Sequence, residues 1–437
     1  MRLLKQLWIV IGAAIAVFVV SWIVYMPNAE QRGVWRAATG GNILRITPLT
    51  AKLYSESSAS CVEQLTFPAH LKLVEMAEGA TLNVTGDTML LHVDGALDPL
   101  PFIRIADLPE RCAKPNANAA SIEVFDALWA AMDEHYAFFD LHNVDWDARR
   151  SLAPDENLSD DALFQLLSDT LVGLDDGHVQ LVSPDANFSP SSNPDWLPEA
   201  ATFTRDDVWQ AARDVIGTDL TPVELTGIEY TLMPDGIGYI MIRHMSLNTP
   251  FNTLSEPAMA SAFAEVAAAL SDAKALIIDL RYNPGGSDSV SFGIASHFTA
   301  QPLDVLTKTT RNGDTQTTPF IATVQPVSNT PLNQPTLILT SNLTGSAAEI
   351  FTMALREMPQ VTIMGENTGG GLSDILSFTL PNGWELGLSH QTYLTMDGTL
   401  FEGTGLPVDI PFEIETAPLA RGEDPLLRAA FDQARNF

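Results

Sequence analysis

The sequence predicts an α/β protein, in which a helical subdomain, a small all-β module and one transmembrane helix precede an α/β core. Continuous apolar runs at residues 275–280, 335–340 and 361–364 alternate with helical segments, a pattern typical of parallel strands that are buried on both faces. Residues 33–112 instead contain short β-rich runs separated by Gly, Pro, Asn and Asp. An uncharged run at residues 7–26 precedes both regions.

The N-terminal run predicts a membrane anchor. About twenty apolar residues at a rise of ~1.5 Å each cross a hydrocarbon core, and Arg2 and Lys5 precede the run. Positive charges tend to stay in the cytoplasm, so we expect an inner (cytoplasmic) membrane protein with most of its chain in the periplasm or outside the cell. The alternative is a signal peptide cleaved after Ala29, although Pro27-Asn28-Ala29 is a poor cleavage site.

Two cysteines, Cys61 and Cys112, agree with export. An oxidising compartment permits a disulfide between them, which would stabilise the fold by roughly 4 kcal/mol in the chain-entropy model. The alternative is a pair of unpaired buried thiols. Their spacing is not that of a metal site such as C-x-x-C.

The charge balance excludes several partners. The chain has 54 acidic and 23 basic residues, for a net charge of −31. Binding to nucleic acid requires clustered Lys and Arg, so no nucleic-acid partner is expected. The hydrophobic content of 46% excludes a wholly disordered acidic chain. Only six residues are lysines, and the last of them is Lys308.

The chain divides into four predicted regions: residues 1–32 as membrane anchor or signal segment, 33–115 as β-rich module, 116–200 as helical subdomain, and 201–437 as α/β core. The strands predicted in the module are residues 43–46, 51–54, 71–74 and 89–93. Helical spacing of apolar residues predicts helices at 121–136, 157–172, 205–216 and 258–270. Residues 187–198, rich in Ser, Pro and Asn, are predicted to form a loop.

Ser346 follows the second buried strand and opens a helix through Leu355. A serine at this position is usually only a helix N-cap. The same position also lets an activated hydroxyl sit above the helix N-terminus, where N–H groups stabilise a developing oxyanion.

Two further segments supply groups for catalysis. Gly285 and Gly286 follow the first buried strand and free the backbone to present N–H groups outward. His178 lies between a predicted helix and a predicted strand, and histidine serves as a general base near neutral pH. Such a base needs a carboxylate to orient it. The acidic residues available for this are Asp175, Asp176, Glu349 and Glu402.

These motifs together resemble a known family. Their order along the chain is Leu-x-Asp-Gly-His, Leu-Ile-Ile-Asp-Leu-Arg-x-Asn-Pro-Gly-Gly, Gly-Ser-Ala-Ala-Glu, Gly-Glu-x-Thr and Gly-x-Pro-x-Asp. The order is similar to that of tail-specific, or C-terminal-processing, serine peptidases. The resemblance is strongest to the branch with the tricorn protease core and the retinoid-binding repeats, and it covers residues 121–431. It implies a crotonase- or ClpP-like core that needs no cofactor and no metal.

The resemblance also implies residue roles. Ser346 matches the nucleophile, His178 the general base, and Glu402 the carboxylate that assists the histidine. The oxyanion hole would consist of main-chain N–H groups, those of Ala347 and of Gly285 or Gly286. Asp279 and Asp409 are expected to hold strand ends and turns.

The chain departs from the family pattern in three ways. Many relatives use a Ser–Lys dyad, but residues 365–374 contain no lysine and none follows Lys308, so a downstream lysine base is excluded. The serine that precedes the histidine in the tricorn pattern is Gly177 here. The span from Val182 to Gly236 is too short for the peptide-binding PDZ module that is common in the family.

The leading hypothesis is an extracytoplasmic, membrane-anchored serine endopeptidase that acts on peptides or proteins through Ser346, His178 and Glu402. The alternative is a catalytically inactive protein of the same fold that binds peptides or lipophilic ligands, as some relatives do. A crotonase-like acyl-CoA enzyme ranks third, because export separates it from coenzyme A and the chain shows no basic phosphate-binding patch.

Overall fold

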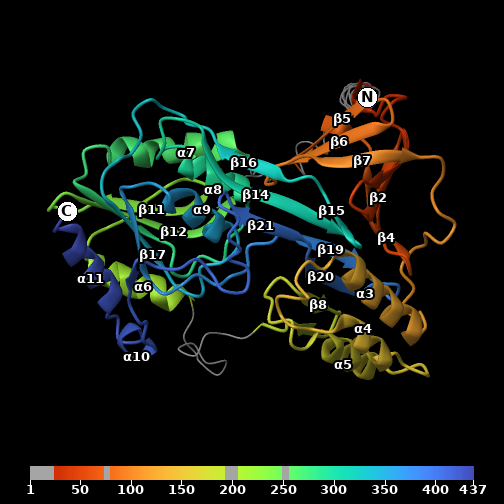
Figure 1. The fold of residues 1–437 in the computed structure, drawn as a ribbon. Coiled ribbons are helices and arrows are strands. Elements are labelled where there is room, and N and C mark those ends of the chain that lie inside the picture. The colour runs from red at the N-terminus through yellow and green to blue at the C-terminus, as the bar shows by residue number, and fades with distance from the viewer. Residues whose placement is uncertain (1–23, 73–78, 192–204, 249–254) are drawn as a thin grey trace, which may run out of the picture.

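The computed structural model describes residues 24–72, 79–191, 205–248 and 255–437. Figure 1 shows a β module (red to orange), a helical subdomain below it, and an α/β core that contains the C-terminus. The predicted anchor at residues 7–26 lies almost wholly outside the described residues. Among the residues that are described, no helix is both long enough and apolar enough to span a membrane.

The module is one antiparallel sheet in the order β4-β3-β2-β1-β7-β6-β5, a half-barrel. Its strands are β1 (Gly33–Ala37), β2 (Gly41–Ile46), β3 (Thr50–Glu56), β4 (Cys61–Pro68), β5 (Ala80–Thr85), β6 (Thr88–Val93) and β7 (Leu100–Ile105). Alternate apolar side chains, among them Trp35, Leu44 and Phe102, pack on one face. Three of the four predicted strands fall within β2, β3 and β6.

The predicted strand at residues 71–74 is wrong where the structure describes it. Leu71 and Lys72 form a helical turn after β4, and the remaining two residues lie outside the described part. Leu71 lines the apolar inner face of the module from this turn. A run of four residues with three apolar side chains does not distinguish a strand from a helical turn.

The predicted disulfide is confirmed. The sulfur atoms of Cys61 and Cys112 are bonded at 2.04 Å, across a sequence separation of 51 residues. The bond joins the start of β4 to the segment after β7, where the Glu63 N–H donates to the Ala113 carbonyl at 2.8 Å. It therefore ties the chain that leaves the module to the module's edge strand.

The helical subdomain contains α3 (Ser121–His135), α4 (Trp146–Arg149), the 3₁₀ turn η1 (Arg150–Leu152) and α5 (Asp160–Leu171). Its sheet, β19-β20-β8-β9, combines β8 (Gln180–Val182) and β9 (Asn187–Phe188) with the distant strands β19 (Ile375–Thr379) and β20 (Glu385–Ser389). Gln180 pairs with Gly387. This pairing brings the segment just before β8 beside the C-terminal third of the chain.

The core sheet has the order β10-β11-β12-β13-β17-β18-β22. These strands are β10 (Thr221–Pro222), β11 (Thr226–Leu232), β12 (Ile237–Leu247), β13 (Ala275–Asp279), β17 (Thr336–Thr340), β18 (Val361–Gly365) and β22 (Ile410–Pro411). All pairings from β12 to β22 are parallel. The three predicted apolar runs are β13, β17 and β18, and because they are parallel, their carboxyl ends share one edge.

Helices cover both faces of this sheet. Ile240, Ile278 and Ile338 pack against α7 (Glu256–Ala269), α8 (Asp288–Ala295) and α9 (Ala347–Arg356). The alternate residues Tyr239 and Ile277 pack against α6 (Arg205–Ile216), α10 (Thr416–Leu419) and α11 (Pro425–Ala434). Figure 1 shows these two helical layers on opposite sides of the strands. Burial on both faces explains why the strands are continuously apolar.

A third sheet joins the core to the rest of the molecule. Its strands are β14 (Leu303–Asn312), β15 (Thr315–Gln316), β16 (Phe320–Val324) and β21 (Gln391–Thr395). Contacts with β19 and β14 help to fix the module against the rest of the molecule: the Thr379 N–H donates to Ser55 Oγ at 2.9 Å, and Lys308 Nζ lies 2.5 Å from Asp98 Oδ1.

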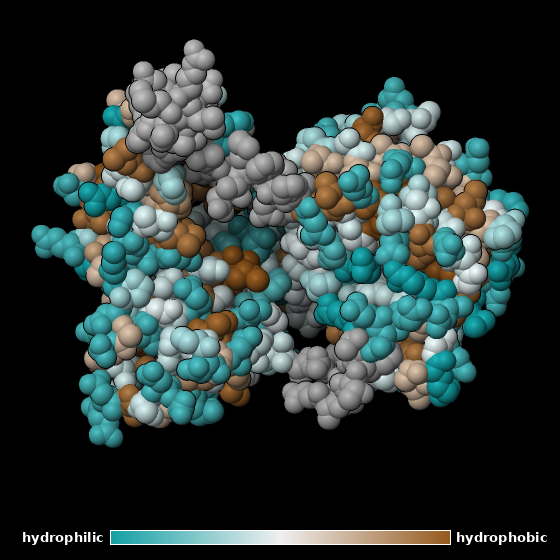
Figure 2. All heavy atoms as spheres, turned by 180° about the vertical axis from the view of Figure 1, so that it is seen from behind, coloured by the Kyte–Doolittle hydropathy of each residue, from teal (hydrophilic) through white to brown (hydrophobic). Residues whose placement is uncertain are grey.

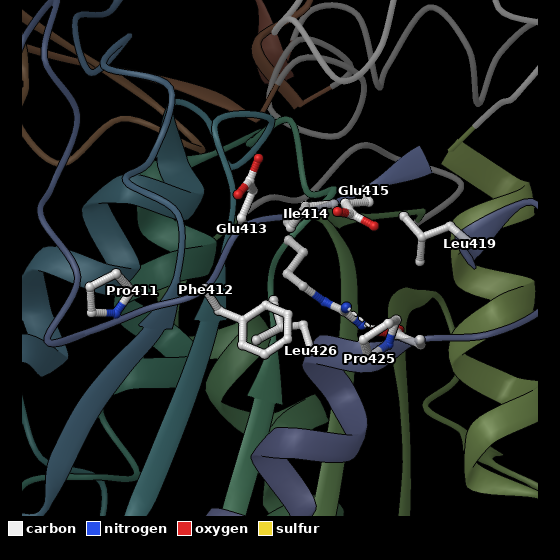
Figure 3. A pocket seen from close by; sticks show the side chains of 10 residues that line it. Pro411, Phe412, Glu413, Ile414, Glu415, Leu419, Pro425 and Leu426 are labelled. Atoms are coloured by element: carbon white, nitrogen blue, oxygen red, sulfur yellow. Dashed lines mark hydrogen bonds and ion pairs between the residues drawn. The ribbon is translucent and has the colours of Figure 1, made fainter. Parts of the chain in front are cut away.

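A buried ion-pair network holds the end of β13. Arg281 is fully buried between Asp279 and Asp424, with nitrogen–oxygen distances of 2.6 and 2.7 Å. Asp424 also caps α11 by accepting from the Leu427 N–H at 3.0 Å. Phe412 and Leu426 line a cavity of about 420 Å³ beside this network (Figure 3). Asp279 therefore holds a strand end, as expected, and Asp409 does the same by accepting from the Ile363 N–H at 2.8 Å.

We predict that Cys61→Ser with Cys112→Ser lowers the free energy of unfolding of the module by about 2–4 kcal/mol, because the unfolded chain regains the entropy of a closed loop. The measurement is urea unfolding monitored by the fluorescence of Trp35, the tryptophan buried in the module core. A double variant as stable as the parent in the same assay would contradict this prediction.

Candidate active site

The segments that follow the parallel strands meet at one edge of the core sheet. The Thr344 hydroxyl donates to the Leu280 carbonyl at 2.9 Å, and the Gly345 N–H donates to the Asn283 carbonyl at 3.0 Å. The loop after β13 and the loop after β17 are thus hydrogen-bonded to each other. This placement follows from the parallel sheet, because neighbouring strands end on the same side.

Ser346 has a strained backbone conformation at the start of α9. Its φ of 52° and ψ of −128° lie outside the regions that residues with a side chain normally adopt. Its N–H is directed to two acceptors, the Gly371 carbonyl at 3.0 Å and Glu349 Oε2 at 2.9 Å. Strain of this kind persists only where surrounding contacts hold the backbone in place, and it is common at functional sites.

Glu349 is the centre of this arrangement. Its fully buried carboxyl group accepts four hydrogen bonds, from the Thr368 hydroxyl (2.6 Å) and from the N–H groups of Gly370 (2.8 Å), Gly371 (2.9 Å) and Ser346 (2.9 Å). Burial raises the pKa of Glu349 to about 7, although the four donors act in the opposite direction. The carboxyl group therefore fixes residues 368–371 and Ser346 relative to one another.

The two glycines of the predicted oxyanion hole differ in their hydrogen bonds. The Gly285 N–H donates to Asn283 Oδ1 at 2.9 Å. The N–H groups of Gly286 and Ala347 make no hydrogen bond to any described residue. A Cβ atom added at Gly285 would lie 2.6 Å from Ser346 Cβ and 2.9 Å from Ala347 N. Only glycine at position 285 leaves the space beside the serine and the helix N-terminus open.

His178 lies at the start of the strand pairing that joins β8 to β20. The backbone N–H of His178 donates to Asp176 Oδ1 at 2.8 Å. The Asp176 carboxylate also accepts from the hydroxyls of Tyr136 (3.1 Å) and Ser389 (3.2 Å). Asp176 therefore holds the backbone of the loop rather than the imidazole ring. The ring faces Gly371, where an added Cβ would lie 3.9 Å from His178 Cε1. His178 Nδ1 is buried and has no hydrogen-bond partner among the described residues.

Glu402 is buried, and its Oε2 accepts from the N–H groups of Leu372 (2.9 Å) and Ser373 (3.1 Å). Burial, followed by the nearby charges of Asp176 and Glu349, raises the pKa of Glu402 well above its ordinary value. This carboxyl group is therefore protonated over a wider pH range than an exposed glutamate.

Ser346, His178 and Glu402 line one open cavity of about 610 Å³. The structure therefore brings together the three side chains that the sequence predicted. No hydrogen bond joins any two of these three side chains. No lysine is among the described residues that line the cavity, and Lys308 lines a different one. No cluster of three metal-ligating side chains occurs in the described ranges.

Two features of the site were not predicted. The role of Glu349 is one of them, because the sequence suggested it only as a possible partner for His178. Ser346-Ala-Ala-Glu349 is a capping-box pattern, S-x-x-E, and this signal indicates contact between the serine N–H and the glutamate. Arg205, which also lines the cavity, carries no such signal in the sequence.

Comparison with known proteins agrees with this geometry. Residues 236–412 match the sequence profile of peptidase family S41, and residues 119–151 match that of the tricorn protease C1 domain. The chain is 27% identical over 142 residues to the carboxy-terminal processing protease CtpA of Bacillus subtilis. The aligned segment covers 32% of this chain and 29% of that protein. It is 26% identical over 187 residues to a CtpA-like serine protease of Staphylococcus haemolyticus. That aligned segment covers 43% of this chain and 35% of the relative. The chain thus spans about a third of the length of the curated relatives it matches.

Solved structures extend the similarity beyond these segments. A protein of Parabacteroides merdae assigned as a peptidase is 28% identical, with a TM-score of 0.61 that covers 72% of this chain and 97% of that one. Mature CPAF, at 13% identity and a TM-score of 0.52 over 72% of this chain and 97% of its own, shares the fold. By sequence profile, residues 236–412 of the chain form a peptidase family S41 domain, and residues 119–151 match the tricorn protease C1 domain.

Proposed function

We propose that this chain is an exported, membrane-anchored serine endopeptidase in which Ser346 is the nucleophile and His178 the general base. The observation that carries the proposal is the convergence of a strained serine at a helix N-terminus, two unengaged N–H groups and a histidine on one cavity. A nucleophile, a base and oxyanion donors at one place are the parts that acyl transfer requires.

In this mechanism His178 takes the hydroxyl proton of Ser346 as the oxygen attacks a peptide carbonyl. The carbonyl oxygen becomes negatively charged, and the N–H groups of Ala347 and Gly286 stabilise it. His178 then gives the proton to the leaving amine, and water, activated by the same histidine, releases the acyl group. The α9 dipole further favours negative charge at this point.

Glu402 is proposed to support the His178 ring. Its carboxyl group lines the same cavity, and the buried Nδ1 of the ring has no partner among the described residues. The Glu402 carboxyl group and the His178 ring would come into hydrogen-bond contact when substrate binds. Catalytic hydrogen bonds often tighten only in the substrate complex. An inactive binding protein of the same fold is the rival, and the lack of hydrogen bonds among the three side chains favours it.

Ser346→Ala is expected to lower kcat for peptide hydrolysis by about a thousandfold or more, because no other hydroxyl replaces the nucleophile. His178→Gln is expected to show a similar loss. The assay is cleavage of a quenched fluorescent peptide library, with circular dichroism as the folding control. Undiminished cleavage by folded Ser346→Ala, or no cleavage by the parent protein, would exclude this mechanism.

Gly285→Ala is expected to lower kcat by about a hundredfold with a smaller change in KM, because its methyl group would displace Ser346 and Ala347, which supplies an oxyanion donor. Gly398→Ala is the matched control, since Gly398 also has a positive φ and an added Cβ there meets nothing within 4 Å. Steady-state kinetics of both variants measure the effect. Equal kcat in the two variants would show that the oxyanion site does not depend on a glycine at position 285.

The location of the protein is a separate proposal that depends on residues 7–26. In a bacterial host, the full chain is expected in the membrane fraction and accessible to protease added from the outside. Removal of residues 1–26 is expected to leave the protein in the cytosol with Cys61 and Cys112 reduced. A full-length protein found in the soluble cytosolic fraction would contradict this proposal.

A further inference from the structure

A second cavity, of about 490 Å³, lies between the β module and the core. We call it the module–core cavity. Figure 2 shows the molecule from behind, hollowed between the lobe that contains the module and the lobe that contains the core. Gly286 lines this cavity, while the adjacent Gly285 lies against Ser346. Asp374 lines it as well, three residues after Gly371 of the catalytic cavity. The two cavities therefore flank the same two loops.

The module–core cavity has more negative than positive charge. Its described lining contains three carboxylates, Asp98, Asp288 and Asp374, and a single cation, Lys308. Lys308 is 2% exposed and already pairs with Asp98 at 2.5 Å and with Asp374 at 3.5 Å. Burial and the charge of Asp374 raise the pKa of Asp288 to about 7, so each added negative charge is costly in this space. A bound cation would relieve this repulsion.

The cavity wall also contains buried polar atoms that have no hydrogen-bond partner among the described residues. His135 is 1% exposed, and its Nε2 makes no hydrogen bond to a described residue; the nearest carboxylate oxygen, on Glu134, is 3.8 Å away. Burial lowers the pKa of His135 to about 4, so the ring is neutral at pH 7. The buried Oε1 of Gln64 is likewise unpaired among the described residues. An unpaired buried acceptor is costly unless a ligand donates to it.

His390 adds a further acceptor. Its Nδ1 lies 3.0 Å from the Asp374 carbonyl, which can only accept, so Nδ1 carries the proton. Burial lowers the pKa of His390 to about 4, and in the neutral ring Nε2 is then an acceptor. The wall therefore combines surplus negative charge with unsatisfied acceptors, whereas its one cation is already paired.

We propose that the module–core cavity is a substrate subsite for a basic side chain, arginine above all; this rests on the proposed peptidase function. A guanidinium group supplies one positive charge and five N–H donors in a fixed plane, which suits acceptors distributed around a wall. Gly286 lines this cavity and directly follows Gly285, which lies against Ser346, so a side chain bound beside Gly286 lies close to the scissile bond. The β module thereby contributes to specificity through Asp98 and Gln64.

The experiment compares peptides that carry arginine or its neutral isostere citrulline at each position around the cleavage site. At the one position whose side chain enters the cavity, the parent protein is expected to cleave the arginine peptide with a kcat/KM at least about tenfold higher than the citrulline peptide. Only arginine makes charged hydrogen bonds to the cavity wall. Asp98→Asn and Gln64→Leu are expected to reduce this ratio. Glu63→Gln is the matched control within the module, since Glu63 pairs with Lys52 at 2.7 Å and does not line the cavity.

Binding to the Ser346→Ala variant, measured by calorimetry, separates this inference from the proposed function. A parent protein that cleaves both peptides alike would overturn the subsite and leave the peptidase intact. If nothing is cleaved but Ser346→Ala still prefers the arginine peptide, the proposed function fails and the cation site stands. Free arginine that binds as tightly as the peptide would overturn the substrate role, because the cavity would then be a site for a small cation.

Discussion

The buried carboxyl group of Glu349 is the interaction on which the candidate site depends. It links the start of α9 to the loop after β18 through four hydrogen bonds, and one of them fixes the N–H of Ser346. Together with the bond from the Ser346 N–H to the Gly371 carbonyl, these bonds offset the cost of the positive φ at Ser346, which is of the order of 1–3 kcal/mol. The position of the hydroxyl above the helix N-terminus therefore follows from a side chain that does not itself reach substrate.

The second constraint is the shared sheet of the helical subdomain. β8 alone is three residues long, and its pairing with β20 places His178 near Gly371. The module is connected to β14 by the Lys308–Asp98 ion pair and to the start of α8 by the hydrogen bond from Ser287 Oγ to the Gly95 carbonyl at 2.9 Å. Ser287 directly follows Gly286, so the module touches the loop proposed to stabilise the oxyanion. Three segments far apart in the sequence thus converge on one site.

Much of this could be predicted from the sequence. β13, β17 and β18 are continuously apolar because both their faces are buried, and the turns after β13 and β17 carry the motifs that identified Gly285 and Ser346. The pairing of β8 with β20 could not be predicted, because a three-residue strand has no periodicity of its own. Lys308 was noted only as the last lysine of the chain. Its burial against Asp98 depends on how the module packs on the core, which local sequence does not encode.

The central claim is that Glu349 holds Ser346 in a reactive position. The measurement is the rate at which a fluorophosphonate probe labels Ser346 in the parent protein and in Glu349→Gln, located by peptide mass spectrometry. Glutamine replaces one of the two accepting oxygens by an amide NH2 group, which cannot accept the hydrogen bonds made there. Labelling of the folded variant is therefore predicted to slow by about tenfold or more while the parent protein is labelled at Ser346. Equal rates in the two folded proteins, or no label at Ser346 in the parent, would contradict the account.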